Sequence, residues 1–384
     1  MRKKVLILTN YYLPGVKGGG PIQSIGNLVD WLSDKIDFYI LTSDRDVGDE
    51  EPYKNIKTNE WIQMDRAKLF YINGRELTLP KLTEIINNVG CDVIYLNSFF
   101  SFKFSIAILL LRKLNKIKKC PLVIAPRGEF SPGALKLKGS KKKLFINLAR
   151  FIGLTNDVKW HATAELEKQD IERIFGKSNN ISVARNLTAN YSGIKFDKKL
   201  KKNIGELKVV FVSRIHPKKN LKKAIELLGS LDGEIDFQIY GPIEDKNYWT
   251  KCQKAINELP SNIKVTYNGL INHEEIVEMF NRHHVFLFPT LGENFGHVIS
   301  EALIGGCPVI ISDQTPWRGL EEFQVGWDIA LENESKFISV LQQCLNMDQG
   351  DYDITSRKAF EYGKILSNRK DDMGRMLQLF ITAN

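Results

Sequence analysis

The chain has 384 residues, 43% of them hydrophobic, and a formal net charge of +9 at pH 7. This length suits two domains rather than one, and the hydrophobic content excludes an intrinsically disordered protein. No run approaches the roughly 20 apolar residues that a membrane-spanning helix needs. The N-terminal apolar run, VLIL, is too short for a signal peptide, so we expect a cytoplasmic protein. Five scattered cysteines without CxxC spacing predict free thiols.

The first half of the chain alternates short β-rich runs with helical runs, which is typical of parallel sheets covered by helices. Strands are predicted at Lys4–Thr9, Phe38–Thr42, Lys68–Ile72, Asp92–Asn97, Leu122–Ala125, Lys159–Thr163 and Ile181–Ala184. Helices are predicted at Ile22–Ser33, Lys81–Asn88, Phe102–Leu114 and Glu165–Phe175. This series predicts a first Rossmann-like domain.

A lysine-rich polar stretch without apolar periodicity, Lys195–Glu206, predicts a linker, after which the alternation resumes. The last segment, Ser356–Phe380, has a helical pattern. Strands are predicted at Lys208–Ser213, Asp236–Tyr240, Lys264–Tyr267, Val285–Pro289 and Pro308–Ser312. The sequence therefore predicts an α/β protein with two Rossmann-like parallel-sheet domains facing a central cleft.

The segment ENFGHVISE places two carboxylates, Glu293 and Glu301, eight positions apart at a loop-to-helix junction. The strand-like run VFLFPT precedes it, so Glu293 is expected at the carboxyl edge of a sheet, where open α/β sheets bind ligands. Glu301 is expected more than one turn into the following helix, whose first N–H groups can bind a phosphate. The loop between the two carboxylates contributes Asn294, Phe295, Gly296 and His297.

Two cations follow the first strand of the second series. Arg214 and Lys219 lie in the loop after Ser213, at the same edge of the expected sheet. Arginine can donate two N–H groups to one phosphate, and lysine adds a mobile point charge. The pair is therefore predicted to bind a diphosphate. Gly241 and Gly269 mark turns after the next two strands.

Two loops of the first domain hold further candidates. The run Gly18–Gly20 has little side-chain bulk, so its backbone N–H groups can approach an anion. Arg127 follows the strand Leu122–Ala125; it either contacts a phosphate or the transferred sugar, or merely pairs with Glu129. His161 ends another strand, where a single histidine is more often structural than catalytic.

Together these motifs resemble the retaining glycosyltransferases of family 4, which have the GT-B fold. The Glu-x7-Glu pair, the preceding FPT and the continuation EAL-x-x-G-x-PVI carry most of the resemblance. Arg214 and Lys219 match the family's G-R-x-x-x-x-K-G element, with Ser213 and Asn220 in place of its glycines. Gly19 and Gly20 match the glycine pair of its first loop. Many members carry His-Gly where this chain has Arg127-Gly128.

The resemblance implies an acceptor-binding domain over residues 1–195, completed by a crossover helix at about 360–384. The lysine-rich linker is placed over residues 196–206, and the resemblance implies a nucleotide-sugar-binding domain over residues 207–360. The implied reaction moves a sugar from a nucleoside diphosphate to an acceptor hydroxyl with retention. Arg214 and Lys219 would stabilise the leaving diphosphate, and Glu293 would orient the donor sugar. The other donor-binding residues would be Glu301, Gly19, Gly20, Asn294, Phe295, Gly296, His297, Gly241, Gly269 and Arg127.

No metal is expected, because the two cations would neutralise the diphosphate. The tripeptide Asp44-Arg45-Asp46 does match the DxD metal-binding signature of the other large glycosyltransferase fold. This motif is frequent by chance, and acidic residues follow it. We therefore interpret it as a solvated acidic loop.

The segment Lys136–Phe151 interleaves lysines with apolar residues and predicts a basic amphipathic helix. Either it lies on an anionic membrane, or it packs its apolar face in the core and leaves its lysines in solvent. With the resemblance, the first reading favours a lipid-linked saccharide acceptor in capsule, O-antigen or exopolysaccharide synthesis.

Two alternatives belong to other functional classes. A UDP-sugar 2-epimerase shares the fold but needs carboxylates and a histidine placed for proton transfer. A non-enzymatic protein that binds lipid surfaces or polyanions would use the positive charge alone. Nucleic acid is not expected as a partner, because no helix-turn-helix, RNA-binding or zinc-finger pattern accompanies the charge.

Overall fold

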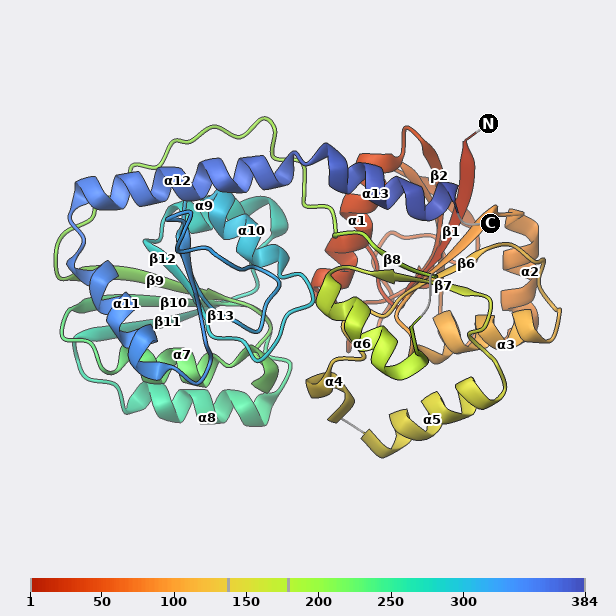
Figure 1. Cartoon of the computed structure of the whole chain (residues 1–384), viewed down its shortest axis with the longest axis horizontal. Coiled ribbons are helices and arrows are strands. Elements are labelled where there is room, and N and C mark those ends of the chain that lie inside the picture. Colours follow the sequence, from red (N-terminus) through yellow and green to blue (C-terminus); the bar gives the residue numbers. More distant parts are fainter. Residues whose placement is uncertain (1, 137–138, 178–179, 383–384) are drawn as a thin grey trace. The chain divides into compact units, whose positions relative to one another are not determined.

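The computed structural model describes residues 2–136, 139–177 and 180–382. It divides into two α/β units (Figure 1). Unit 1 comprises Met1–Asn190 and Arg369–Asn384, and unit 2 comprises Tyr191–Asn368. Both units are mixed α/β with a central sheet, as the alternating pattern predicts.

Unit 1 is built on an eight-stranded sheet in the order β3-β4-β2-β1-β5-β6-β7-β8. All pairings are parallel except that of β3 with β4. Most strands are continuous apolar runs, as a sheet buried on both faces requires, and all those predicted for this half are present. The edge strand β3 was not predicted, since it is short and half-buried. The strands are β1 (Lys3–Leu8), β2 (Ile36–Ser43), β3 (Trp61–Met64), β4 (Ala67–Ile72), β5 (Val93–Asn97), β6 (Leu122–Ala125), β7 (Val158–Ala162) and β8 (Ile181–Val183).

Helices cover both faces of this sheet. On one face pack α1 (Gly20–Leu32) and the C-terminal helix α13 (Lys370–Ile381), whose last carbonyls accept hydrogen bonds from Lys3 Nζ. The other face is covered by α2 (Leu79–Val89), α3 (Ala107–Lys113), α5 (Gly139–Phe151) and α6 (Glu165–Phe175). A π-helical turn, η1 (Phe102–Ile106), leads into α3, and the short helix α4 (Pro132–Lys136) precedes α5.

Unit 2 contains a parallel six-stranded sheet in the order β11-β10-β9-β12-β13-β14. The chain runs from β9 outward to β10 and β11, then returns to place β12 on the other side of β9. Ligands of open α/β sheets bind at the carboxyl edge where the strand order reverses in this way. The strands are β9 (Glu206–Val212), β10 (Glu234–Tyr240), β11 (Ile263–Gly269), β12 (Val285–Phe288), β13 (Val309–Ser312) and the unpredicted β14 (Gly326–Ile329).

The helices of unit 2 also form two layers, with α7 and α8 on one side of the sheet and α9, α10 and α12 on the other (Figure 1). Short 3-10 turns, η2 (Pro217–Lys219) and η3 (His273–Glu275), precede α7 and α9. The helices are α7 (Leu221–Leu228), α8 (Lys246–Asn257), α9 (Ile276–Asn281), α10 (His297–Ile304), α11 (Glu334–Asn346) and α12 (Gln349–Ser367). Among the described residues, every helix is too short or too polar to span a lipid bilayer.

The structure divides between residues 190 and 191, before the linker predicted over residues 196–206, because the lysine-rich segment packs on unit 2. Lys198 Nζ donates hydrogen bonds to His283 O at 2.7 Å and Gly306 O at 2.8 Å. Lys202 Nζ donates to the carbonyls of Leu345 and Met347, both at 3.0 Å. The expected helix over Ser356–Phe380 is also divided, since α12 belongs to unit 2 and α13 to unit 1.

Candidate functional site

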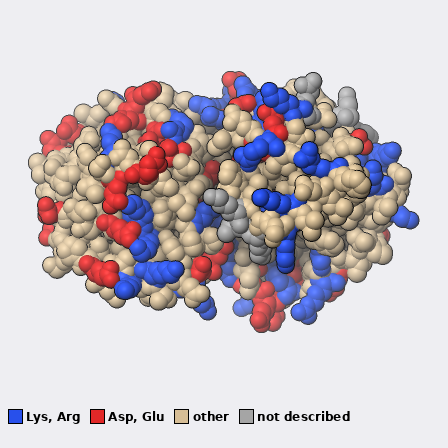
Figure 2. All heavy atoms as spheres, turned by 60° about the horizontal axis from the view of Figure 1, so that its bottom comes forward, with Lys and Arg blue, Asp and Glu red and all other residues tan. Residues whose placement is uncertain are grey.

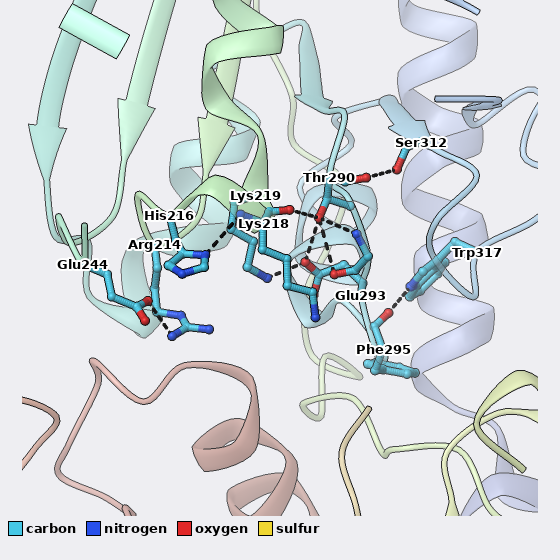
Figure 3. Close-up of polar contacts among 11 residues, drawn as sticks. Arg214, His216, Lys218, Lys219, Glu244, Thr290, Glu293, Phe295, Ser312 and Trp317 are labelled. Carbon is cyan, nitrogen blue, oxygen red and sulfur yellow. Dashed lines mark hydrogen bonds and ion pairs between the residues drawn. The ribbon is translucent and has the colours of Figure 1, made fainter. Parts of the chain in front are cut away.

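Lys219 and Glu293 meet where the strand order of unit 2 reverses. Lys219 ends the turn after β9, and Glu293 lies in the loop between β12 and α10. Their side chains form an ion pair and are only 13% and 12% exposed (Figure 3). The Lys219 ammonium also lies 5.7 Å from the centre of the Phe288 ring. Because water is largely excluded, charges here act strongly on a bound ion.

The Glu293 carboxylate is positioned by its own loop and by the end of β13. The Thr290 hydroxyl lies 3.3 Å from Glu293 Oε1 and 3.2 Å from Lys218 O, and it accepts a hydrogen bond from Gly292 N (Figure 3). The Ser312 hydroxyl donates to Thr290 O at 2.5 Å. Glu293 N donates to Gln314 O at 2.9 Å. The carboxylate is therefore held before any ligand binds.

Asn220 joins the Lys219 turn to the end of β12. Its backbone has a φ of 61°, a conformation that favours glycine and that asparagine tolerates better than most residues. Its side-chain amide donates to Pro289 O at 2.9 Å. Asparagine at this position therefore adopts the left-handed turn and also joins it to the end of β12 through a hydrogen bond.

Arg214 lies in the same loop as Lys219 but pairs with a different carboxylate. Its Nη1 is 2.6 Å from Glu244 Oε2, and the two side chains are 38% and 37% exposed (Figure 3). Gly241 allows the chain after β10 to approach the Arg214 loop closely, because a Cβ at that position would lie 1.9 Å from Ser213 O. Gly269 ends β11 and accepts a hydrogen bond from Gly241 N at 2.7 Å. Both glycines position backbone next to the Arg214 loop.

The predicted loop from Asn294 to His297 leads into α10. Gly296 has a φ of 79° and precedes the helix, whose N-terminus no side chain caps. Phe295 O accepts a hydrogen bond from Trp317 Nε1 at 2.6 Å (Figure 3). The Phe295 ring packs against buried His297. The hydrogen bond from Trp317 and the contact with His297 therefore fix the conformation of this loop.

Glu301 lies further along α10 and is buried, with 3% of its surface exposed. Its Oε1 is 3.4 Å from His273 Nε2, a neighbour that the sequence did not suggest. Tyr191 is a second unpredicted neighbour. Its hydroxyl is buried and has no hydrogen-bond partner among the described residues, and burial together with the Glu301 charge raises its pKa. A protonated phenol near a buried carboxylate could serve a ligand hydroxyl.

In unit 1, Arg127 does not pair with Glu129, so that alternative was wrong. Arg127 follows β6 with a φ of 57°, and its guanidinium donates to Asn97 Oδ1 at 2.5 Å, to Tyr95 Oη at 2.9 Å and to Asn186 Oδ1. The half-buried Glu129 carboxylate instead accepts hydrogen bonds from Ser98 Oγ and from the backbone N–H groups of Phe99 and Phe100.

His161 completes a buried chain of hydrogen bonds behind Arg127. Tyr95 Oη lies 2.8 Å from His161 Nδ1, and His161 Nε2 lies 2.8 Å from Ala184 O. Since Tyr95 accepts from Arg127, its own hydrogen goes to Nδ1, which assigns the proton to Nε2. Burial and the Arg127 charge lower the pKa of His161 to about 3. His161 is thus neutral and structural, and unit 1 offers no titrating histidine here for an epimerase.

The remaining first-domain candidates line the loop between β1 and α1. Gly19, with a φ of 62° and ψ of −134°, precedes α1, and Gly20 is its first residue. The interpretation of Asp44-Arg45-Asp46 as a solvated loop was wrong. Asp46 is buried and accepts hydrogen bonds from Val16 N at 2.7 Å and Lys17 N at 2.9 Å, so it supports this glycine loop. No cluster of three His, Cys, Asp or Glu residues suited to a metal occurs in the described ranges.

The predicted basic helix over Lys136–Phe151 forms α4 and α5, apart from residues 137 and 138, which lie outside the described residues. Ile146 and Ala149 face the core. A second apolar stripe faces solvent, because Leu144, Leu148 and Phe151 are 72%, 52% and 89% exposed. Packing in the core therefore accounts for only one of the two apolar stripes on this helix.

Comparison with known proteins places these features in a family context. Residues 194–347 match the family model of the glycosyl transferases group 1. A Klebsiella pneumoniae protein, described as an uncharacterised 41.2 kDa protein in the cps region, is 26% identical over 228 residues. That match covers 58% of this chain and 60% of the relative.

Several solved structures share the whole fold at low identity. Sucrose-phosphate synthase from Thermosynechococcus elongatus superposes with a TM-score of 0.72 at 15% identity, over all of both chains. Anabaena HepE in complex with UDP and glucose gives 0.69 at 16% identity, over 99% of each chain. WaaG, a glycosyltransferase involved in lipopolysaccharide biosynthesis, gives 0.67 at 13%, over 98% of each. The chain therefore has the GT-B glycosyltransferase fold, and its residues 194–347 match the glycosyl transferases group 1 family.

Proposed function

We propose that this protein is a retaining glycosyltransferase that moves a sugar from a UDP-sugar to an acceptor hydroxyl. The observation that carries the proposal is the sheltered Lys219–Glu293 pair at the carboxyl edge of β9 and β12. HepE, which shares the fold, has been crystallised with UDP and glucose and with UDP-glucose, which supports UDP as the nucleotide.

The chemistry follows from where charge develops during transfer. Departure of the sugar leaves negative charge on the nucleoside diphosphate, and preorganised cations stabilise such charge best in a water-poor site. Lys219 and Arg214 would bind the diphosphate, together with the N–H groups at the start of α10. Glu293 would orient the donor sugar, and Glu301 would bind the ribose hydroxyls. No divalent metal takes part in this proposal, and no side chain is assigned as a covalent nucleophile.

The acceptor in this proposal is a lipid-linked saccharide of a bacterial surface polysaccharide. The Klebsiella relative belongs to a cps region, which supports capsule synthesis as the setting. The exposed stripe Leu144, Leu148 and Phe151 on α5, with Lys141 and Arg150 on the same helix, supports docking on an anionic membrane. Lysine and arginine side chains, drawn in blue, gather over unit 1 on the face shown in Figure 2.

A thermal-shift screen against UDP, GDP, CMP, ADP and dTDP, with and without EDTA, tests the proposal. A ligand present at 100 times its Kd and specific for the native state adds roughly 2.7 kcal/mol of stability. We expect a shift with UDP that EDTA does not change and that Lys219→Ala abolishes. Lys222→Ala is the matched control, because Lys222 pairs with Glu226 on the surface of α7.

The absence of a shift with every nucleotide would contradict the transferase and favour the lipid-surface alternative. His161 does not support the epimerase, because a buried hydrogen-bond network holds it neutral. A thermal shift that disappears with EDTA would reject only the proposal that no divalent metal takes part.

A further inference from the structure

Arg127 is a half-buried cation whose partners are all neutral. Its three hydrogen bonds end on two amide oxygens and one phenol, and it forms no ion pair with any carboxylate that the structure describes. The two carboxylates that contact its loop are already occupied. Glu129 binds backbone N–H groups, and Glu167 accepts from Gly128 N at 2.6 Å and Thr163 N at 2.7 Å. A sheltered charge without a counter-ion is costly, and a bound anion would relieve that cost.

The guanidinium is also fixed in one orientation. Tyr95, Asn97 and Asn186 hold it from two separate parts of the chain, and Tyr95 is held in turn by His161. A guanidinium has five N–H donors, so three bonds leave two donors for a ligand. The left-handed backbone of Arg127 adds strain, which persists where the surroundings enforce it and is common at functional sites.

Arg127 lies just beyond the carboxyl edge of the unit 1 sheet. It follows β6, and its partner Asn97 ends β5, which neighbours β1 where the strand order of unit 1 reverses. Further polar groups surround this edge, since Asn97 Nδ2 lies 3.4 Å from Thr9 Oγ1 and Ser101 Oγ donates to Asn10 Oδ1 at 2.6 Å. Open α/β sheets bind ligands at this edge.

We propose that Arg127 binds a carboxylate or phosphate group of the acceptor at the carboxyl edge of the unit 1 sheet, so that the enzyme selects an acidic acceptor. A planar guanidinium matches the oxygens of either group with two parallel hydrogen bonds. This inference rests on the proposed transferase function, since it names the class of acceptor.

Titrations at constant ionic strength test the proposal on the full-length protein. Three probes are compared by calorimetry: methyl glucuronide for an acidic sugar, inorganic phosphate for a phosphate group, and methyl glucoside as the neutral reference. Wild type should bind at least one anion roughly tenfold or more tightly than the glucoside, as expected for hydrogen bonds to a charged group. Whichever anion binds identifies the source of the charge.

Arg127→Gln should lose this preference, whereas Arg75→Gln, which changes an exposed turn residue of unit 1, should keep it. Arg127→Lys keeps the positive charge but loses the planar guanidinium with its paired N–H donors. It should reduce the preference for the anion even if Arg127→Gln does not fold. Equal binding of all three probes by wild type, or an undiminished preference in a folded Arg127 variant, would overturn the proposal. UDP binding is measured in parallel, and its absence in wild type would reject the transferase separately.

Discussion

At the scale of single residues, Lys219 and Glu293 have opposite relations to a bound diphosphate. Lys219 attracts the phosphates, whereas the Glu293 carboxylate competes with them for the ammonium. Lys219→Ala should therefore weaken UDP binding and transfer together. Glu293→Gln should leave UDP affinity equal or higher, because the ammonium is released, while transfer falls by roughly 100-fold, as for loss of one preorganised electrostatic contact. Calorimetry with UDP and a turnover assay that follows UDP release measure both quantities. Equal loss of UDP affinity in the two variants would contradict the separate roles.

Two buried tyrosines of unit 2 differ in whether the hydroxyl has a partner. Tyr191 has none among the described residues, whereas Tyr352 donates to His283 O at 3.2 Å. Tyr191→Phe should therefore leave the free energy of unfolding unchanged or raise it slightly, while Tyr352→Phe should lower it by about 1 kcal/mol. Urea unfolding of the two variants without ligand compares them directly. A loss in Tyr191→Phe as large as that in Tyr352→Phe would show that the hydroxyl has a stabilising partner after all.

The sequence predicted the cations and carboxylates of the site better than it predicted their partners. Lys219 and Glu293 stand beside strands that their apolar runs reveal, so their meeting at one sheet edge could be expected. The pairing of Arg214 with Glu244, and the proximity of Tyr191 to Glu301, depend on how loops distant in sequence pack. Local pattern carries no information about such contacts.

At the scale of elements, α5 is a helix with two apolar stripes, and the described part of the chain covers only one of them. Replacing Leu144, Leu148 and Phe151 together with serine should weaken binding to vesicles containing anionic lipid by more than roughly tenfold, since each apolar side chain contributes on the order of 1.5–3 kcal/mol on burial. Vesicle sedimentation measures this. Leu166→Ser on α6, which is 67% exposed, is the control and should bind normally.

Binding should also fall with salt and with neutral lipid, because the lysines of α5 act through the surface potential. Equal sedimentation of wild type and the triple variant would remove α5 from the membrane proposal. UDP binding in the triple variant should be intact, since Lys219 and Arg214, which are proposed to bind the diphosphate, belong to unit 2.

The lysine-rich segment after residue 191 shows where composition misleads. Lysines without apolar periodicity usually mark solvated chain, yet Lys198 and Lys202 turn inward and bind carbonyl groups of unit 2. Burial lowers the pKa of Lys198 to about 8. A long apolar stem with a polar end can cross a packed layer in this way, and composition alone cannot distinguish it from an exposed lysine.

At the scale of the whole molecule, the fold class was predictable because parallel strands buried on both faces leave continuous apolar runs. The predicted strands of both units are present, while the short strands β3 and β14 lack such runs. The unit boundary was less predictable, because it is set by contacts of irregular chain such as Tyr191–Gly205 rather than by a pattern of its own.

Buried histidines in both units make the stability of the molecule depend on pH. Burial lowers the pKa of His161 and His284 to about 3 and that of His283 to about 4. In the unfolded chain they titrate near 6.5, so between these values the unfolded state binds more protons. Their contribution is therefore complete above about pH 6.5 and is lost as the pH falls, by roughly 1.4 kcal/mol per group and pH unit. Glu129, whose pKa burial raises, acts in the opposite direction.

His284→Gln isolates one of these contributions. His284 Nδ1 accepts from Lys208 N at 2.8 Å and its Nε2 lies 3.0 Å from Lys201 O, and a glutamine amide offers the same acceptor and donor without titrating. Urea unfolding at pH 7 and pH 5 should show a loss of stability in wild type that is smaller in the variant by about 2 kcal/mol. The same loss in both proteins would mean that His284 accepts a proton without unfolding. In that case its ring would have to leave the carbonyl of Lys201, and the lysine-rich segment would open locally before unit 2 unfolds.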